Sequence, residues 1–193
     1  GLLNLEHPKS KAAGLVDRQE AIEIFVYSIR HPQFGTFIID SGVSTSFADP
    51  TVKNEASWIV EAAMNMSALA VQKTTKELES ELGGIDGVFL THIHMDHIMG
   101  LPDLSSTPVY GGPGDASLAT MMNMFTQGST DRMLGNVDVL KQWQFDEAGI
   151  IDIFGDGSLW AIHTPGHTPG ATAYLAMTTM GPQLMIGDAT HTA

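Results

Sequence analysis

The feature that most constrains this chain is a cluster of metal-ligand residue types directly after a short apolar segment. Residues 87–91 read as a buried strand, and His92-Ile93-His94-Met95-Asp96-His97 follows them without a spacer. On a strand-like backbone His92 and His94 point the same way and can share one cation. Asp96 and His97 follow where the chain turns, and they can face a second cation. The pattern therefore predicts a site for Zn²⁺ or a neighbouring transition metal, in preference to a solvated polar loop.

Two later segments carry further candidate ligands. His167 lies within Thr164-Pro165-Gly166-His167-Thr168-Pro169-Gly170, where the prolines stiffen the backbone and can hold one imidazole in a fixed place. Asp188 stands in Gly187-Asp188-Ala189 after a predicted strand, where a carboxylate can bridge two cations. Each segment is weak evidence by itself, because a lone turn histidine is usually just exposed and a strand-end aspartate usually caps a loop.

The remaining pattern predicts one layered α/β (α+β) domain over residues 1–193. The stretch 54–82 is rich in Ala, Met and Leu without Gly or Pro, which predicts one or two helices. Asp115 predicts the cap of a helix from 116 to about 125, and 127–149 predicts loop and short strand. Since strands cluster at both ends with helices between them, a sheet-and-helix sandwich is favoured over a helix bundle. β-branched and aromatic runs predict strands at 21–29, 36–39, 87–91, 108–110, 150–154, 158–163, 171–177 and 183–186, with a turn at Gly181-Pro182 before the last.

Charge and composition narrow the class of partner. Nine Lys and Arg against 22 Asp and Glu give a net charge of −13 at pH 7, which disfavours nucleic acid and anionic membrane surfaces. The chain has no cysteine, so thiolate ligands and disulfides are excluded. The start lacks signal-peptide features and an initiator Met, so a cytoplasmic location is favoured while removal of an upstream segment stays open. His7 and His31 have no motif around them and read as surface residues. The oligomeric state is open.

Together the three ligand segments resemble the metallo-β-lactamase superfamily of metal-dependent hydrolases, with a ligand set similar to that of its lactonase and glyoxalase II-like members. The resemblance runs from about Ile22 to the last residue, and Ile39-Asp40-Ser41-Gly42 resembles the early strand-to-loop element of the family. It implies an αββα sandwich, in which two sheets face each other, helices lie outside and metals sit at the sheet edge.

The resemblance also implies residue roles. It assigns His92, His94 and His167 to a first metal, Asp96 and His97 to a second, and Asp188 to both. The cofactors implied are two divalent ions, with Zn²⁺ as the default and Fe, Mn or Co as alternatives for the same donors. A hydroxide held between the ions would be the nucleophile. Asp96 would orient it or shuttle its proton.

This chain departs from the family pattern after Asp188. Dinuclear members carry one more His well downstream, whereas nothing follows Ala193 here. We expect a domain truncated before its final helix and strand, and the alternative is a complete chain with a defective second site. His191 is the local candidate for a substitute ligand or a catalytic acid. The competing interpretation is a tail histidine with no role.

The expected substrate is a small molecule with an acyl bond. The absence of Cys excludes the β-lactamase subclasses that use a cysteine ligand, and Asp188 argues against the remaining subclass. The length and the acidic charge disfavour the members that act on nucleic acid. Hydrolysis of an ester or lactone is therefore the leading prediction. Hydrolysis of a β-lactam or thioester is the second. A metal-binding but catalytically impaired structural or regulatory domain is the third.

Overall fold

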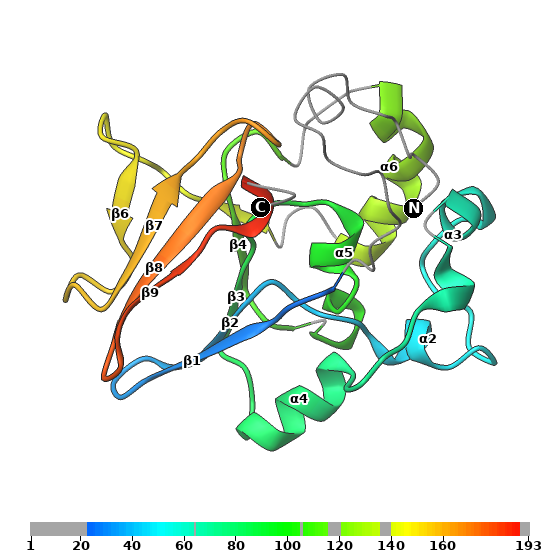
Figure 1. Ribbon diagram of the computed structural model, residues 1–193, viewed down its shortest axis with the longest axis horizontal. Coiled ribbons are helices and arrows are strands. Elements are labelled where there is room, and N and C mark those ends of the chain that lie inside the picture. Colours follow the sequence, from blue (N-terminus) through cyan, green and yellow to red (C-terminus); the bar gives the residue numbers. More distant parts are fainter. Residues whose placement is uncertain (1–22, 64, 105, 116–120, 136–139, 190–193) are drawn as a thin grey trace, which may run out of the picture.

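The computed structural model of this chain describes residues 23–63, 65–104, 106–115, 121–135 and 140–189. Within this part of the chain two sheets lie face to face (Figure 1). The first has the strand order β1-β2-β3-β4-β5 and the second the order β6-β7-β8-β9. In Figure 1 the second sheet lies on the left, and helices α2 to α6 lie beyond the first sheet, on the right and below. Three of the four layers of an αββα sandwich are thus present in the described residues.

The first sheet brings several strand ends to one edge. Its strands are β1 (Tyr27–His31), β2 (Gly35–Ile39), β3 (Gly87–Phe89), β4 (Val109–Gly111) and β5 (Leu140–Gln142). β1 and β2 form an antiparallel hairpin, whereas β2, β3, β4 and β5 are parallel neighbours. Because the carboxyl ends of parallel strands meet at the same edge, the segments after β2, β3 and β4 emerge side by side, as ligand-binding loops of open α/β sheets do.

The second sheet is antiparallel throughout. It consists of β6 (Ile150–Asp152), β7 (Leu159–His163), β8 (Thr172–Thr178) and β9 (Gly181–Met185). The predicted turn at Gly181-Pro182 is wrong, because β9 begins at Gly181 and the turn is made by Thr179 and Met180. Pro182 pairs with Met177 inside the hairpin. A proline is tolerated there because β9 is an edge strand of the described sheet.

The helices agree with the sequence-based expectation of one or two helices over 54–82 and differ from it in a later stretch. The bounds are α2 (Thr45–Ala48), α3 (Trp58–Ala63), η1 (Met66–Ala68), α4 (Thr75–Leu82), α5 (Met95–Ile98), η2 (Leu101–Leu104), α6 (Met121–Leu134) and η5 (Gly187–Ala189). The stretch 54–82 is broken into α3, η1 and α4, and α4 starts at a capping box formed by Thr74 and Glu77. In the described residues, no helix has the length and apolar character needed to cross a membrane.

The difference is α6, which continues to Leu134 where loop and short strand were predicted. Gly128 and the polar residues after it hide the helical pattern in the sequence. Tertiary contacts hold this part of the helix: Ser57 N donates to Ser129 Oγ at 3.0 Å, and Arg132 Nε donates to the carbonyl of Glu55 at 2.8 Å. Packing therefore overrides weak local propensity here.

Two apolar cores fill the spaces between the layers. Between the first sheet and the helices, Ile38 and Val88 of the sheet and Leu90 just after β3 pack with residues of α5, η2 and α6. Between the two sheets, Phe37, Ile39 and Phe89 pack against residues of β7, β8 and β9. β2 and β3 are buried on both faces, which explains why they read as continuous apolar runs.

His31 corrects another sequence-based expectation. It was expected at the surface, yet only 7% of it is exposed. Its ring packs against those of Phe34 and Phe154, at centroid distances of 4.8 and 4.7 Å, and these two rings stack on each other. Its Nε2 lies 2.9 Å from Asp156 Oδ2. The histidine therefore joins the β1–β2 hairpin to the β6–β7 hairpin instead of facing solvent.

Candidate metal centre

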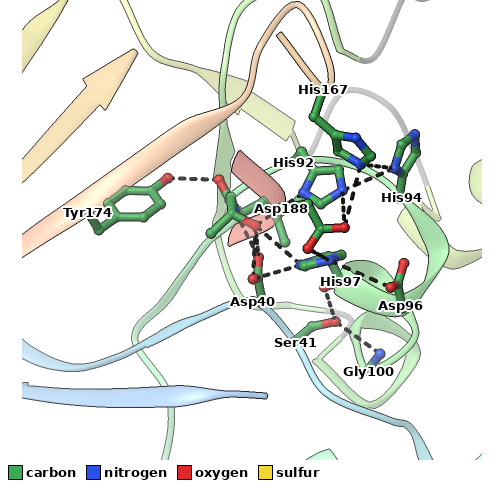
Figure 2. A network of polar contacts seen from close by, with 12 residues as sticks. Asp40, Ser41, His92, His94, Asp96, His97, Gly100, His167, Tyr174 and Asp188 are labelled. Atoms are coloured by element: carbon green, nitrogen blue, oxygen red, sulfur yellow. Dashed lines mark hydrogen bonds and ion pairs between the residues drawn. The ribbon is translucent and has the colours of Figure 1, made fainter. Parts of the chain in front are cut away.

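All six residues predicted as ligands meet at one edge of the two sheets (Figure 2). His92 and His94 lie on the segment after β3, and Asp96 and His97 lie in α5, which begins directly after His94. His167 comes from the loop between β7 and β8, and Asp188 lies in η5 after β9. The first sheet thus supplies four of the predicted ligands and the second sheet two. His191 lies outside the described residues.

Three imidazole nitrogens converge in the first group. His94 Nδ1 lies 3.1 Å from His92 Nε2 and 2.8 Å from His167 Nε2. A neutral imidazole carries one N–H and one lone pair, so three ring nitrogens at such distances suit a shared cation that accepts their lone pairs. Burial lowers the pKa of His94 and favours the neutral form that a metal requires. The donor set is that of a three-histidine zinc site.

A second group surrounds His97. The ligand atoms of His92, His97 and Asp188 lie within 4.8 Å of one another, as do those of the first group. Asp188 Oδ1 is 3.4 Å from His97 Nε2, and its Oδ2 is 3.5 Å from His167 Nε2. One carboxylate therefore faces both groups. Asp96 stands beside this second group, with its Oδ2 3.7 Å from His97 Nε2.

A buried carboxylate orients His97 from behind. Asp40 follows β2, and its Oδ2 lies 2.8 Å from His97 Nδ1. Its Oδ1 accepts a hydrogen bond from Thr91 N at 2.8 Å. Burial by itself lowers the pKa of His97, but the hydrogen bond and charge of Asp40, together with the charges of Asp96 and Asp188, outweigh it and raise that pKa to about 9. With the Nδ1 proton donated to Asp40, Nε2 faces the site, as carboxylates behind metal-bound histidines arrange.

The helix that carries Asp96 and His97 is anchored to the end of β2. Ser41 Oγ donates to the carbonyl of His97 at 2.8 Å and accepts from Gly100 N at 3.0 Å. A Cβ on Gly100 would lie 1.8 Å from the carbonyl oxygen of Ser41. Glycine is required at this close approach of two backbones. α5 is therefore fixed relative to the loop that carries Asp40.

A model of the metallo-beta-lactamase superfamily matches residues 24–175. The chain belongs to this superfamily. The membership confirms the resemblance seen in the sequence and the class of the fold. All six predicted ligand residues lie at the same sheet edge in this superfamily member, although four of them come from the first sheet and two from the second.

Curated relatives of this superfamily member are named N-acyl homoserine lactonase AttM. One is from Azorhizobium caulinodans and the other from Agrobacterium fabrum, and each is 28% identical over 121 residues. The match covers 61% of this chain and 46% of each relative, so the chain spans about half the length of the curated relatives it matches.

Solved structures share the fold. A B. thuringiensis AiiA mutant with N-decanoyl-L-homoserine bound at the active site superposes with a TM-score of 0.56 and 16% identity, covering 87% of this chain and 64% of that one. A probable metal-dependent hydrolase from Staphylococcus aureus gives a TM-score of 0.60 at 16% identity, covering 83% and 56%. At this level of identity the likeness concerns the fold alone.

Sequence reasoning missed two carboxylates around this metallo-beta-lactamase superfamily site. Asp40 was assigned only to a strand-to-loop element, although an acidic residue directly after a buried apolar strand is a usable signal for a second-shell group. Asp115 was expected to cap a helix at 116, and residues 116–120 lie outside the described ones. That cap stays a prediction, and the described bonds of the Asp115 carboxylate are to the loop of His167. His163 donates to the carbonyl of Pro169 in the same loop at 2.8 Å.

Proposed function

We propose that this protein is a hydrolase that uses two divalent metal ions. The first would be held by His92, His94 and His167, the second by Asp96 and His97, with Asp188 shared between them. The position of Asp188 is the observation that carries the proposal, because its two oxygens lie 3.4 Å from His97 Nε2 and 3.5 Å from His167 Nε2. A carboxylate placed between two sets of ligands is what a bridged pair of cations requires.

The residues fit zinc by donor type. Nitrogen and carboxylate oxygen donors without sulfur suit Zn²⁺, and Fe, Mn and Co remain alternatives for the same set. The carboxylates of Asp96 and Asp188 offset the charge of two dications, and Asp40 holds the Nε2 atom of His97 toward them. When bound, such ions supply Lewis acidity, which makes water a competent nucleophile at neutral pH and polarises a substrate carbonyl.

Asp96 is the residue we assign to proton transfer. It lies beside His97 at the rim of the second group, and its side chain is 22% exposed, so it can reach both the site and solvent. From there it can orient the attacking water and take its proton, which is the role of a general base. The scissile bond then breaks with the proton passed on to the leaving group.

The substrate we propose is a neutral ester or lactone with an acyl group. The curated relatives are named N-acyl homoserine lactonases, which supports a lactone. The net charge of −13 disfavours a polyanionic substrate. A β-lactam or a thioester is the alternative within the same chemistry.

One observation favours the non-catalytic alternative, a metal-binding structural or regulatory domain. His92 belongs to both groups of ligand atoms, so in the described residues the second group has a single imidazole of its own, from His97. A cation there would be held more weakly than in the first group. Metal stoichiometry therefore separates the two functions.

The test combines metal analysis with a substrate panel. The purified protein is loaded separately with Zn²⁺, Mn²⁺, Fe²⁺ and Co²⁺, its metal content is measured, and it is assayed with an N-acyl homoserine lactone, a simple ester, a β-lactam and a thioester. Two metals per chain with lactone or ester hydrolysis is the expected result. One metal or none, with no turnover on the panel, contradicts the proposal.

Two variants assign the residues. Asp188→Asn is expected to lose the second metal and most of the activity, whereas Asp156→Asn, a carboxylate on the β6–β7 hairpin, serves as the control. Full activity of the Asp188 variant would refute the shared-ligand assignment. His191→Ala tests the tail histidine, and unchanged metal content and rate would remove His191 from the site.

A further inference from the structure

One buried carboxylate joins the two loops that carry the first group of ligands. Asp115 follows β4 and is only 1% exposed. Its Oδ1 accepts from Gly170 N at 2.6 Å, and its Oδ2 accepts from Thr168 Oγ1 at 3.0 Å. The backbone of Ile93, between His92 and His94, lies close enough to this carboxylate to lower its pKa. Asp115 therefore lies beside the His92–His94 segment and binds the His167 loop at the same time.

The loops around Asp115 are in direct contact. A Cβ on Gly112 would lie 1.6 Å from the carbonyl oxygen of Gly170, and one on Gly170 would lie 2.7 Å from Asp115 Cγ. Both positions therefore require glycine, because the backbones approach too closely for a side chain. Thr168 is buried as well. The residues that flank His167 on its carboxyl side thus have a single position against the segment after β4.

His163 holds the same loop from the second sheet. Its Nε2 donates to the carbonyl of Pro169 at 2.8 Å. Its ring stacks on Phe145, with centroids 5.0 Å apart and an interplanar angle of 15°. Residues 168–170 therefore hydrogen-bond both to Asp115, which follows β4 of the first sheet, and to His163 in β7 of the second.

Burying a carboxylate costs free energy, which hydrogen bonds must offset. Burial raises the pKa of Asp115, while the hydrogen bonds from Gly170 and Thr168 counteract the rise. His167 reaches the site from a different sheet than His92 and His94, so no local spacing sets its distance from them. A functional constellation must be held within about 0.5 Å by its supporting residues. Asp115 supplies a common anchor for both segments.

We propose that Asp115 is a positioning residue that fixes the His167 loop against the His92–His94 segment so that the three imidazoles converge on one cation. The inference rests on the metal binding proposed above. It assigns to Asp115 no contact with substrate. It predicts that the cost of losing the carboxylate appears in metal affinity and in ligand geometry, beyond any loss of fold stability.

The test compares Asp115→Asn with a matched control. Asparagine keeps the shape but has no charge and only one acceptor oxygen for the two donors, Gly170 N and Thr168 Oγ1. Asp103→Asn is the control, because Asp103 Oδ2 also joins two segments, accepting from Thr45 N at 2.9 Å and Lys76 N at 3.1 Å, and contacts neither ligand loop. Zinc affinity is measured by competition with a chromophoric chelator, melting is recorded on the metal-free protein, and the Co²⁺-loaded protein is examined by visible absorption.

Asp115→Asn is expected to weaken zinc binding by about 10- to 100-fold, as loss of second-shell partners does, and to change the Co²⁺ spectrum. Asp103→Asn is expected to lower the metal-free melting temperature with zinc affinity and Co²⁺ spectrum unchanged. Thr168→Val removes a single hydrogen bond and should give a smaller loss of zinc affinity in the same direction, so it carries the test if the Asp115 variant does not fold.

The outcomes separate this inference from the proposed function. If the unmodified protein binds zinc and Asp115→Asn or a folded Thr168→Val binds it equally well, with an unchanged Co²⁺ spectrum, the positioning role is overturned while the metallohydrolase proposal stands. If Asp103→Asn weakens zinc binding as much as Asp115→Asn, the effect is one of general stability and the role is likewise overturned. If the unmodified protein binds no metal, both proposals fail.

Discussion

Replacing Asp40 with asparagine is expected to weaken metal binding at His97 without disturbing the backbone. Asp40 has a φ of 56°, a left-handed conformation that asparagine tolerates, so the substitution adds no backbone strain. The carboxylate faces three donors: the Thr91 hydroxyl, 2.9 Å from Oδ2, and two N–H groups, those of His97 Nδ1 and Thr91 N, each at 2.8 Å. An asparagine amide offers one oxygen and one NH₂ group, so it cannot accept from both in the present tautomer.

The free-energy cost depends on which way the asparagine amide is turned. If the amide nitrogen faces His97, the imidazole must accept at Nδ1, and its proton moves to Nε2, the atom that faces Asp188 at 3.4 Å. A protonated Nε2 cannot bind a cation. Loss of such a second-shell partner weakens metal affinity by about 10- to 100-fold, which equals about 1.4–2.7 kcal/mol. If the amide is reversed, the buried Thr91 N–H loses its partner, at a cost of about 1–3 kcal/mol.

Zinc competition titrations and melting curves with and without metal measure the two effects. Asp103→Asn again serves as the control, since it removes a carboxylate that binds backbone groups away from the site. Unchanged zinc affinity of the Asp40 variant, with an NMR spectrum of the zinc-loaded protein showing Nε2 of His97 unprotonated, would contradict this prediction.

Three further outcomes follow from the same structure. In the metal-free protein the pKa of His97 is raised from its ordinary 6.5 to about 9, so its stabilising contribution is complete below pH 6.5 and disappears as the pH rises through 9. Melting temperatures over that range should fall, and a flat profile would contradict it. Gly100→Ala places a Cβ 1.8 Å from the Ser41 carbonyl and should cost on the order of 3 kcal/mol in urea unfolding, an estimate that an unchanged midpoint would reject. Phe89→Ala empties the core between the sheets and should cost about 3–5 kcal/mol by the same assay, whereas a loss under about 1 kcal/mol would mean that the sheets repack.

The strands and the ligand segment from His92 to His97 were largely predictable because their signals are local. Phe37 to Ile39 and Val88 to Phe89 are apolar runs that lie buried on both faces, so their composition reports their place in the fold. α6 was not predictable beyond 125, because contacts from Ser57 and Glu55 decide its length and nothing in its own residues does. The same reason explains His31, whose burial depends on a phenylalanine and an aspartate more than 100 positions later in the chain.

The types of metal ligand and their order along the chain can be read from the amino-acid sequence. His92, His94, Asp96 and His97 share one short segment, so their spacing already indicates a common site. Tertiary structure alone decided which groups orient those ligands. Asp40 meets His97 across 57 positions, and Asp115 meets Gly170 across 55. Such pairs arise because parallel strands bring their carboxyl ends to one edge and the second sheet packs against it, and no spacing in the chain encodes which side chains then face each other.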